Sequence, residues 1–290
     1  MDLKTFSIAM LASAAVLSAA MAGAWWIQRR TRNTGWIDVI WSFSVGSVAL
    51  LTSLAPLSGD SAYAPRQIGV ACLVGAWSFR LGWHILLRTR EVGDDPRYRN
   101  WIEGWGLAAD RRMLFNLQIQ AAVGLLLCLA VLLAAHNPHP GLRIQDYLGG
   151  LVLLAGIAGE MIADFQLRRC RQLMGKRAVC EIGLWRLSRH PNYFFEWLCW
   201  CAYPIIAIDF GGGNPFGWFA LFAPVCMYWL LTSVSGIPPL EEHMLRTRGD
   251  FYRAYQRRTA AFFPLPKRSG LSDEPGNDEI SHRGRDGAED

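Results

Sequence analysis

The chain has 290 residues, of which 52% are hydrophobic and 18% are charged, and its net charge at pH 7 is +5. Its mean hydropathy of +0.15 averages very apolar stretches with strongly basic connections, a split that is typical of membrane proteins. The basic charge is not accompanied by an aromatic and basic recognition stripe, so we expect no nucleic-acid partner. The long apolar runs do not alternate, which excludes a membrane β-barrel and predicts an all-α, polytopic membrane protein.

Seven apolar stretches of roughly 20 residues predict seven transmembrane helices, because a backbone in lipid must satisfy its own hydrogen bonds. The first stretch has some features of a signal peptide, but Trp25, Trp26 and Arg29 after it favour a retained helix with an interfacial anchor. The predicted spans are 6–27, 36–55, 67–87, 114–135, 144–165, 193–210 and 215–234.

Basic residues are distributed unevenly between the two sides of these spans. All but four of the 29 Lys and Arg residues fall in connections on one side; Lys4, Arg66 and Arg143 lie on the other, and Arg80 lies within a span. Basic residues accumulate in cytoplasmic loops. We therefore expect the N-terminus outside, the C-terminus in the cytoplasm, and a location in the bacterial inner membrane.

One membrane domain is expected over residues 1–264, because the helices follow one another too closely for a separate soluble domain. Within it, an aromatic and basic stretch predicts that residues 236–264 form a cytoplasmic interfacial cap folded back over the bundle. Residues 265–290 have almost no apolar side chains and predict a disordered tail. The seven cysteines form no CxxC pair, so we expect free thiols and no metal site.

Five ionisable side chains lie at positions where lipid disfavours them unless they pair or line a polar cavity. They are Asp38, Arg80, Glu160, Asp164 and Glu196. Glu160 and Asp164 are four residues apart and share a helix face, which Arg168 and Arg171 continue. This stripe is either a helix end that pairs its own charges or a pocket in which carboxylates bind hydroxyls or amides and arginines bind phosphates.

The strongest local motif is the sequence SRHPNYFFE, which ends at Glu196. Its proline suits the first turn of a helix, so Asn192 and Glu196 are expected to project inward near the cytoplasmic end. His190 lies just outside that helix as a donor to an anion. Glu196 could merely pair with a buried arginine such as Arg80, but its polar neighbourhood favours a site.

Two further groups are weaker indications. Arg80 carries His84 one turn later on the same predicted helix, and Asp38 on the second span is a candidate partner that the sequence alone does not decide. Residues 241–258 combine acidic, histidine, tyrosine and arginine side chains, a pattern more often found in an amphipathic helix on the membrane than in a binding element. No GxGxxG, Walker or HExxH motif is present, so soluble nucleotide and zinc architectures are not expected.

Taken together, these residues resemble the membrane reductases of the steroid 5α-reductase-like superfamily, which also includes sterol C14 and C7 reductases. The similarity covers nearly all of the membrane domain. It rests on residues 77–80, on the spacing of Asp164, Arg168 and Arg171, on residues 189–193 with Glu196 and Trp200, and on residues 249–264. The resemblance implies a seven-helix fold that encloses NADPH from the cytoplasmic side and reduces a carbon–carbon double bond in a lipophilic steroid or isoprenoid enone.

The resemblance also implies roles for individual side chains. Glu196 is implied to be an acid near the nicotinamide and substrate, with Asp38 and His84 as further catalytic candidates. Hydride would pass to the β-carbon of the enone while an acid hydrogen-bonds to the carbonyl group as enolate charge develops. Contacts to NADPH are implied for Asp164, Arg168, Arg171, Arg177, Arg189, His190, Asn192, Tyr193, Trp200, Glu242, His243, Tyr252 and Tyr255.

Departures from the family pattern concern the substrate half. Animal steroid reductases hold the ketone with a tyrosine on the third span and a Gln-Glu pair on the second, where this chain has Trp77 and residues 38–41. An asparagine expected at the start of the polar stripe is Glu160 here.

Apart from a lipophilic substrate and membrane lipids, we expect no obligatory protein partner.

Two other classes of protein are compatible with the sequence. Membrane methyltransferases of the isoprenylcysteine or phospholipid type also carry an Arg-His-Pro-x-Tyr block and a Glu-Glu pair like that at residues 241–242. They usually have glycine soon after the tyrosine, and S-adenosylmethionine needs fewer arginines because it has no phosphate. The third class is a non-catalytic lipid- or sterol-binding protein that has kept the fold.

Overall fold

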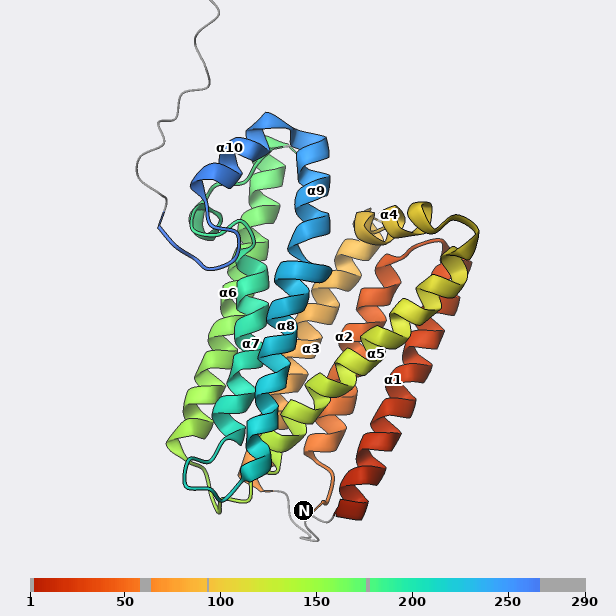
Figure 1. The fold of residues 1–290 in the computed structure, drawn as a ribbon. Helices are drawn as coiled ribbons and strands as arrows, with labels where there is room; N and C mark the ends of the chain where they lie inside the picture. Colours follow the sequence, from red (N-terminus) through yellow and green to blue (C-terminus); the bar gives the residue numbers. More distant parts are fainter. Residues whose placement is uncertain (1–2, 58–63, 93, 176–177, 267–290) are drawn as a thin grey trace, which may run out of the picture.

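The chain folds into a bundle of long helices (Figure 1), seen in a computed structural model that describes residues 3–57, 64–92, 94–175 and 178–266. Within these ranges there is no β-strand, and one isolated bridge joins Ser188 to Ala260. The prediction of an all-α fold is confirmed. The α-helices are α1 (Leu3–Thr31), α2 (Gly35–Ser53), α3 (Pro65–Val92), α4 (Pro96–Trp105), α5 (Ala109–Ala135), α6 (Ile144–Met174), α7 (Pro191–Ala207), α8 (Phe222–Trp229), α9 (Ile237–Arg248) and α10 (Asp250–Arg258).

Shorter helical turns connect several of these helices. They are the 3₁₀ helices η1 (Gly106–Ala108), η2 (Gly183–Arg186) and η3 (Pro215–Leu221), and the π-helical turn η4 (Leu230–Val234). Because η3, α8, η4 and α9 follow one another almost without a break, they form one long rod that runs along α7 and beyond it (Figure 1).

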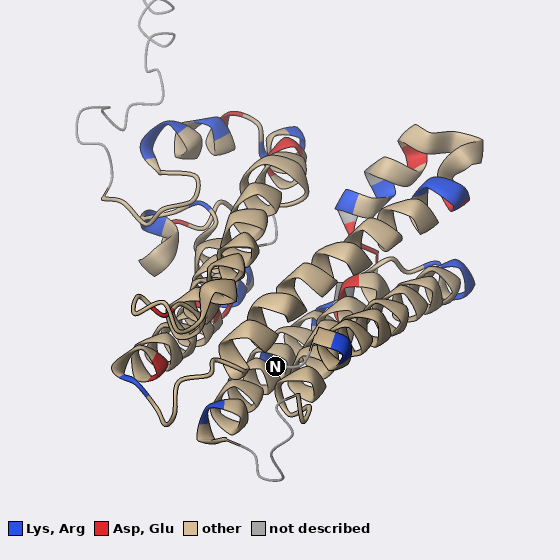
Figure 2. Cartoon of the chain, turned by 60° about the horizontal axis from the view of Figure 1, so that its bottom comes forward, with Lys and Arg blue, Asp and Glu red and all other residues tan. Residues whose placement is uncertain are grey.

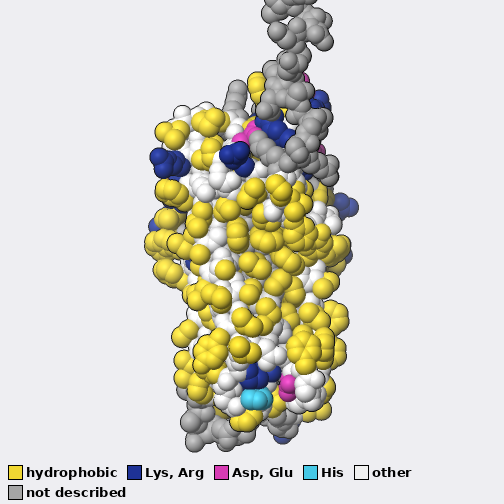
Figure 3. Space-filling view, turned by 90° about the vertical axis from the view of Figure 1, so that its left-hand side faces the viewer, with side chains coloured by type: hydrophobic (Ala, Val, Ile, Leu, Met, Phe, Trp, Pro, Cys, Tyr) yellow, Lys and Arg dark blue, Asp and Glu magenta, His cyan; other side chains and the backbone are white. Residues whose placement is uncertain are grey.

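Within the described residues, six helical segments are long and apolar enough to cross a membrane. Five of them contain α1, α2, α3, α5 and α6, and the sixth is the rod from Pro215 to Arg248. The seventh predicted span, 193–210, falls on α7, which is helical but has only 17 residues. The outer surface agrees with a membrane location, since apolar side chains cover the face shown in Figure 3 between charged groups at its two ends.

α6 and α7 pack closely because glycine replaces a side chain wherever their backbones approach. A Cβ atom at Gly149 would lie 2.4 Å from Ile206, one at Gly156 2.5 Å from the Cys199 sulfur, and one at Gly159 2.3 Å from the Phe195 ring. Small residues are the usual means of close helix contact in membranes, where there is no hydrophobic driving force between helices. The glycine-lined contact therefore fixes α7 against α6.

Arg66 closes the end of the bundle that lies opposite α9 and α10. Its side chain, 4% exposed, pairs with Asp146 at 3.0 Å at the start of α6. It also donates hydrogen bonds to the carbonyl oxygens of Asn137, at 2.9 Å, and His139, at 2.8 Å. One guanidinium thus ties the start of α3 to the α5–α6 connection, and we name this set of contacts the Arg66 clamp.

At the other end, α9 and α10 fold back over the ends of α6 and α7 (Figure 1); they lie within residues 236–264, for which a cytoplasmic interfacial cap stays a prediction. The Tyr255 hydroxyl donates to the Trp185 carbonyl oxygen at 2.5 Å, and the Arg189 amide donates to the Ala260 carbonyl oxygen at 2.8 Å. Of the predicted disordered tail, residues 267–290 lie outside the described residues.

The glycine-lined contact generates a prediction. Gly159→Leu forces a side chain against the Phe195 ring and should lower the free energy of unfolding by about 1–3 kcal/mol, the usual cost of overpacking. Thermal unfolding of the purified protein in detergent measures the loss. Gly69→Leu is the matched control, because no heavy atom lies within 4 Å of a Cβ at Gly69; equal melting temperatures for the two variants would contradict the prediction.

Candidate functional site

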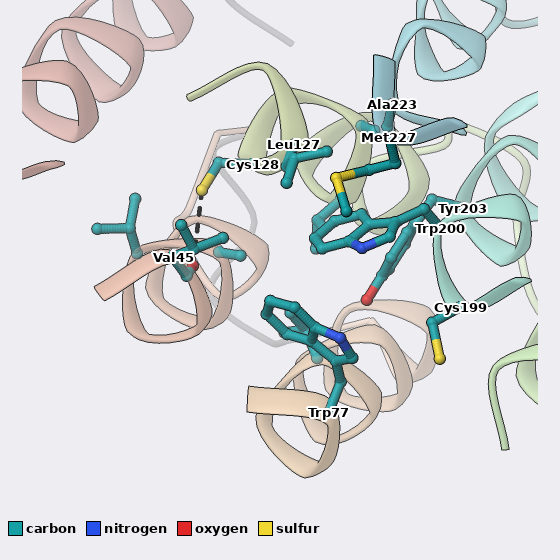
Figure 4. Packing of buried hydrophobic residues seen from close by; sticks show 14 of the residues in the cluster. Val45, Trp77, Leu127, Cys128, Cys199, Trp200, Tyr203, Ala223 and Met227 are labelled. Carbon is teal, nitrogen blue, oxygen red and sulfur yellow. Dashed lines mark hydrogen bonds between the residues drawn. The ribbon is translucent and has the colours of Figure 1, made fainter. Parts of the chain in front are cut away.

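The carboxyl group of Glu196 lies in the interior of the bundle, with 7% of the residue exposed. Its Oε2 accepts a hydrogen bond from the Trp77 indole of α3, and its Oε1 accepts one from the Trp200 indole of α7, both at 2.9 Å. The two indole rings meet edge to face with centroids 4.8 Å apart (Figure 4). Because an indole N–H can only donate, both bonds hold Glu196 as an acceptor.

Arg80 of α3 lies between two carboxyl groups of α6. It forms ion pairs with Glu160 and Asp164, and none of the three side chains is more than 10% exposed. His84 adds a contact of 3.5 Å from its Nδ1 to the carboxylate of Asp164. The partner of Arg80, which the sequence left open, is therefore α6 and not Asp38.

Glu196 and the Arg80 ion pairs form one electrostatic group, because Glu160 interacts with both Glu196 and Arg80. One guanidinium faces three carboxyl groups there, and excess negative charge is strongly unfavourable away from water. The Oε2 atom of Glu160 is buried and has no hydrogen-bond partner in the described part of the chain. We call Arg80, Glu160, Asp164 and Glu196 the buried acid group. Its charge balance favours a carboxyl group that keeps a proton, which is the capacity of a general acid.

Helical spacing explains why these side chains meet. Trp77, Arg80 and His84 repeat every three or four residues along one face of α3, and Glu160 and Asp164 do so on α6. The glycine-lined contact then brings Glu196 on α7 beside Glu160. The sequence predicted the polar faces of the helices separately, and the packing joins them.

Asp38 belongs to a different polar group, at the ends of α2, α4 and α5. It accepts hydrogen bonds from Arg97 at 2.5 Å and from the Tyr98 hydroxyl at 2.8 Å. Gln120 of α5 donates to the same Tyr98 oxygen at 3.1 Å. These partners of Asp38 lie on α4, so the structure does not bring this catalytic candidate together with Glu196.

Glu241 of α9 joins the end of the chain to the start of α7. It accepts hydrogen bonds from Arg189 and from Gln256, each at 2.7 Å, and lies 3.0 Å from His190 Nε2. The Tyr252 hydroxyl donates to it at 3.3 Å. Burial lowers the pKa of His190, although the neighbouring carboxylate opposes this shift. Arg189, His190 and Tyr252, predicted to bind a cofactor, are therefore engaged within the protein; we call this set the Glu241 latch.

The cofactor candidates at the end of α6 have no such partners in the described residues. Arg168 and Arg171 are exposed, and neither side chain has an ion pair or hydrogen bond within the residues that the structure describes. Arg171 lies near enough to Arg88 of α3 and Arg248 of α9 for like-charge repulsion. Figure 2 shows that most Lys and Arg positions lie at helix ends. Three helices thus bring guanidinium groups to one region, which a phosphate would stabilise.

The remaining predicted contacts are spread around these groups. Tyr193 stacks on His190 with ring centroids 5.5 Å apart and faces the Arg97 and Asp38 group. Asn192 is partly buried beside it, Glu242 is exposed, and Arg177 lies outside the described residues. Trp200 donates its indole hydrogen bond to Glu196, and the Tyr255 hydroxyl bonds α10 to the Trp185 carbonyl oxygen. His243 lies near Arg248 on α9.

Sequence reasoning missed two residues of the site region. Trp77 was noted as part of the segment that carries the family resemblance and as a departure from a family tyrosine, but not as a partner of Glu196, although its spacing to Arg80 and His84 already put it on their helix face. Tyr203 was not singled out, yet it lies seven residues after Glu196, two turns along the same face of α7. Its hydroxyl is buried and has no hydrogen-bond partner in the described ranges.

A hollow of about 570 Å³ is an apolar groove between α7 and α8 that we call the α7–α8 groove; its walls include Trp197, Cys201, Pro204, Val225 and Tyr228. Another hollow, of about 270 Å³, has both apolar walls and charged side chains, among them Arg29 and Asp94. The buried acid group lines neither of these hollows. The described residues contain no cluster of three or more His, Cys, Asp or Glu side chains suited to a metal ion.

Residues 24–259 match a protein family whose description is "protein of unknown function (DUF1295)". The chain belongs to this family. The match extends from α1 to the end of α10, so both the buried acid group and the Glu241 latch lie within it. Neither a curated protein nor a solved structure matches the chain significantly.

Asp95 generates a prediction about pH. Its side chain caps α4 and accepts hydrogen bonds from Arg88 at 2.7 Å and Arg97 at 3.0 Å. Burial alone would raise the pKa of Asp95, but the charge and hydrogen bonds of Arg97, with Arg88, outweigh it and lower the pKa to about 2. The folded pKa thus lies below the unfolded value of about 3.9, so ionised Asp95 stabilises the fold above pH 4 and this stabilisation is lost as the pH falls towards 2.

Asp95→Asn keeps the helix cap but removes the charge. It should lower the free energy of unfolding by about 2 kcal/mol at pH 7, and the difference from the wild type should shrink as the pH falls from 4 to 2. Unfolding curves across this range measure both effects. Asp110→Asn, which removes an exposed ion pair with Arg29, should change stability little; a pH-independent loss in Asp95→Asn would refute the assignment.

Proposed function

We propose that the protein is an NADPH-dependent membrane reductase that saturates a carbon–carbon double bond in a lipophilic enone, most simply the Δ4 bond of a 3-oxo steroid. The observation that carries this proposal is the continuity of one polar face of α6. Its buried carboxyl groups meet Glu196, and its exposed end carries Arg168 and Arg171 without partners in the described residues. A phosphate-bearing cofactor needs such cations at the aqueous end, and an apolar substrate needs an acid deeper in the bundle.

The residues at that end fit the charge of NADPH. Arg168 and Arg171 would hold its phosphates, and the repulsion of Arg171 by Arg88 and Arg248 gives these groups a reason to accept an anion. Tyr193 at the start of α7, one turn before Glu196, offers an aromatic ring near Arg88, the arginine that repels Arg171. The resemblance to steroid 5α-reductase-like enzymes supports the same proposal, because it implies a cofactor at this end.

NADPH supplies a hydride when it is bound. Addition of the hydride to the β-carbon of an enone leaves an enolate, which must take one proton at the α-carbon to give the saturated ketone. The buried acid group can hold that proton, because a single arginine faces its three carboxyl groups. The partly exposed His84 contacts Asp164, a member of this group, so it offers a route by which the proton is replaced.

We also propose seven transmembrane spans, with α7 as the short one, an external N-terminus and a cytoplasmic C-terminus in the bacterial inner membrane. The support is the position of the basic residues, most of which lie at the end of the bundle that carries α4, α9 and α10 (Figure 2). Such a bias follows the rule that cytoplasmic loops are positively charged. Its consequence is that NADPH would enter from the cytoplasm.

A second candidate is a membrane methyltransferase that uses S-adenosylmethionine. The specific observation in its favour is the Glu241 latch, in which Arg189 and His190 contact the Glu-Glu pair directly. These are the two sequence features that the chain shares with such enzymes. Transfer of a labelled methyl group from S-adenosylmethionine to a membrane lipid or isoprenylcysteine, without NADPH turnover, would replace the reductase proposal.

The phosphate assignment predicts a difference between two cofactors. Arg171→Ala should weaken NADPH binding by about 10- to 100-fold, as expected for a charge-assisted hydrogen bond, and NADH binding much less, if Arg171 meets the 2′-phosphate. Equilibrium titration of the purified protein measures both affinities. Arg169→Ala, which removes an exposed neighbouring arginine, is the control; equal losses for NADPH and NADH would reject the assignment.

The acid assignment predicts a loss of turnover without a loss of cofactor binding. Glu196→Gln keeps the size of the side chain but not the acid, and its single amide oxygen replaces only one of the two oxygens that accept the indole bonds. NADPH-dependent saturation of a 3-oxo-4-ene steroid should therefore fall by about 10²- to 10⁴-fold, while the Kd for NADPH stays within about twofold. Mass spectrometry of the steroid follows the reaction, and Glu103→Gln on the surface of α4 is the control. Full activity in Glu196→Gln would exclude Glu196 as the acid.

A further inference from the structure

We propose that the Tyr203 hydroxyl is the hydrogen-bond donor that binds the oxygen atom of a lipophilic ketone inside the bundle. The role of Tyr203 in the reaction rests on the proposed function. The inference adds to that function the residue that recognises the substrate. It also separates two roles, because Tyr203 binds the carbonyl oxygen while the buried acid group supplies the proton.

Tyr203 is a buried polar residue without a partner. The residue is 1% exposed, and its hydroxyl oxygen has no hydrogen-bond partner within the described ranges. Leaving a buried hydroxyl unpaired is unfavourable, and phenylalanine would fill the same volume without this cost. A tyrosine here is therefore better explained by a bond that forms when a ligand is present.

The hydroxyl points back towards Glu196. Side chains on a helix lean towards its N-terminus, so the Tyr203 ring returns along α7 towards Cys199 and Glu196, with both of which it interacts electrostatically. Figure 4 shows its oxygen directed into the space between Trp77, Trp200 and Cys199. A ketone oxygen bound there would place the attached carbons beside the indole pair and close to the buried acid group.

Other donors around this space are already engaged. The indoles of Trp77 and Trp200 donate to the two oxygens of Glu196. The Cys199 thiol donates to the Leu153 carbonyl oxygen at 3.7 Å. Tyr203 is thus the donor left for a ligand among the described residues drawn in Figure 4. A ketone only accepts hydrogen bonds, so it complements this donor, and the apolar walls complement a hydrocarbon skeleton.

A ligand can approach Tyr203 from the bilayer side. Pro204, the next residue in α7, lines the α7–α8 groove on the outer face of these helices. On the inner face, Met227 of α8 lies beside Trp200 (Figure 4). Its unbranched side chain adapts to a new neighbour more easily than a ring does. The groove is therefore lined by the residue that follows Tyr203 in α7, and we propose it as the entrance for a lipophilic ligand.

The test compares two steroids that differ by one oxygen, androst-4-en-3-one and androst-4-ene, with the full chain in lipid nanodiscs. The wild type should bind the ketone about tenfold more tightly, as expected for one net hydrogen bond. Tyr203→Phe should abolish this preference by weakening the ketone alone, with NADPH binding unchanged and a melting temperature equal to or above that of the wild type. Tyr147→Phe, an exposed tyrosine of α6, is the matched control.

Each contrary result has a definite meaning. If the wild type does not prefer the ketone, or if Tyr203→Phe keeps the preference, Tyr203 is not the ketone donor. A lower melting temperature with the preference retained would instead assign its hydroxyl to a structural bond with buried water. A ketone preference lost in Tyr203→Phe, in a protein that never oxidises NADPH, would reject the reductase and keep the binding site. If Tyr203→Phe instead leaves the NADPH-dependent turnover of the ketone unchanged, the binding site at Tyr203 is rejected and the reductase proposal is kept.

Discussion

The ion pairs of Arg80 set the arrangement of the helices around them. A guanidinium at this depth has no solvent to bind, so it needs carboxyl groups from a neighbouring helix. Glu160 and Asp164 provide them from α6, which fixes α3 against α6 in both rotation and height. Since the glycine-lined contact fixes α7 against α6, the position of Glu196 beside Glu160 follows from these two contacts together.

The charge of this group is what the proposed chemistry depends on. One interpretation of the α6 stripe was a helix end that pairs its own charges, but the acids of α6 pair with Arg80 of α3 instead. Three carboxyl groups, those of Glu160, Asp164 and Glu196, surround this one guanidinium. The pairs that hold the helices together are therefore compatible with the proposed role of a carboxyl group that carries a proton.

The sequence predicted the parts of the fold that depend on local periodicity. The helices, the returning cap and the polar faces of α3 and α6 follow from apolar runs and from three- and four-residue spacing. The sequence did not predict which of those faces meet, because this depends on the distances between helices. Those distances are set by residues elsewhere, such as the glycines of the α6–α7 contact. Asp38 and Arg80 illustrate this limit, because their charges alone would allow them to pair with each other. The helix packing instead pairs Asp38 with Arg97 and pairs Arg80 with Asp164 of α6.

The Arg66 clamp bears on the end of the bundle at which small molecules enter. It ties the start of α3 to the α5–α6 connection at one end of the bundle, where the guanidinium occupies carbonyl oxygens and a carboxylate that would otherwise attract water. These groups are satisfied within the protein and offer little to a polar ligand. Under the proposed function, polar molecules would therefore enter at the basic end of the bundle.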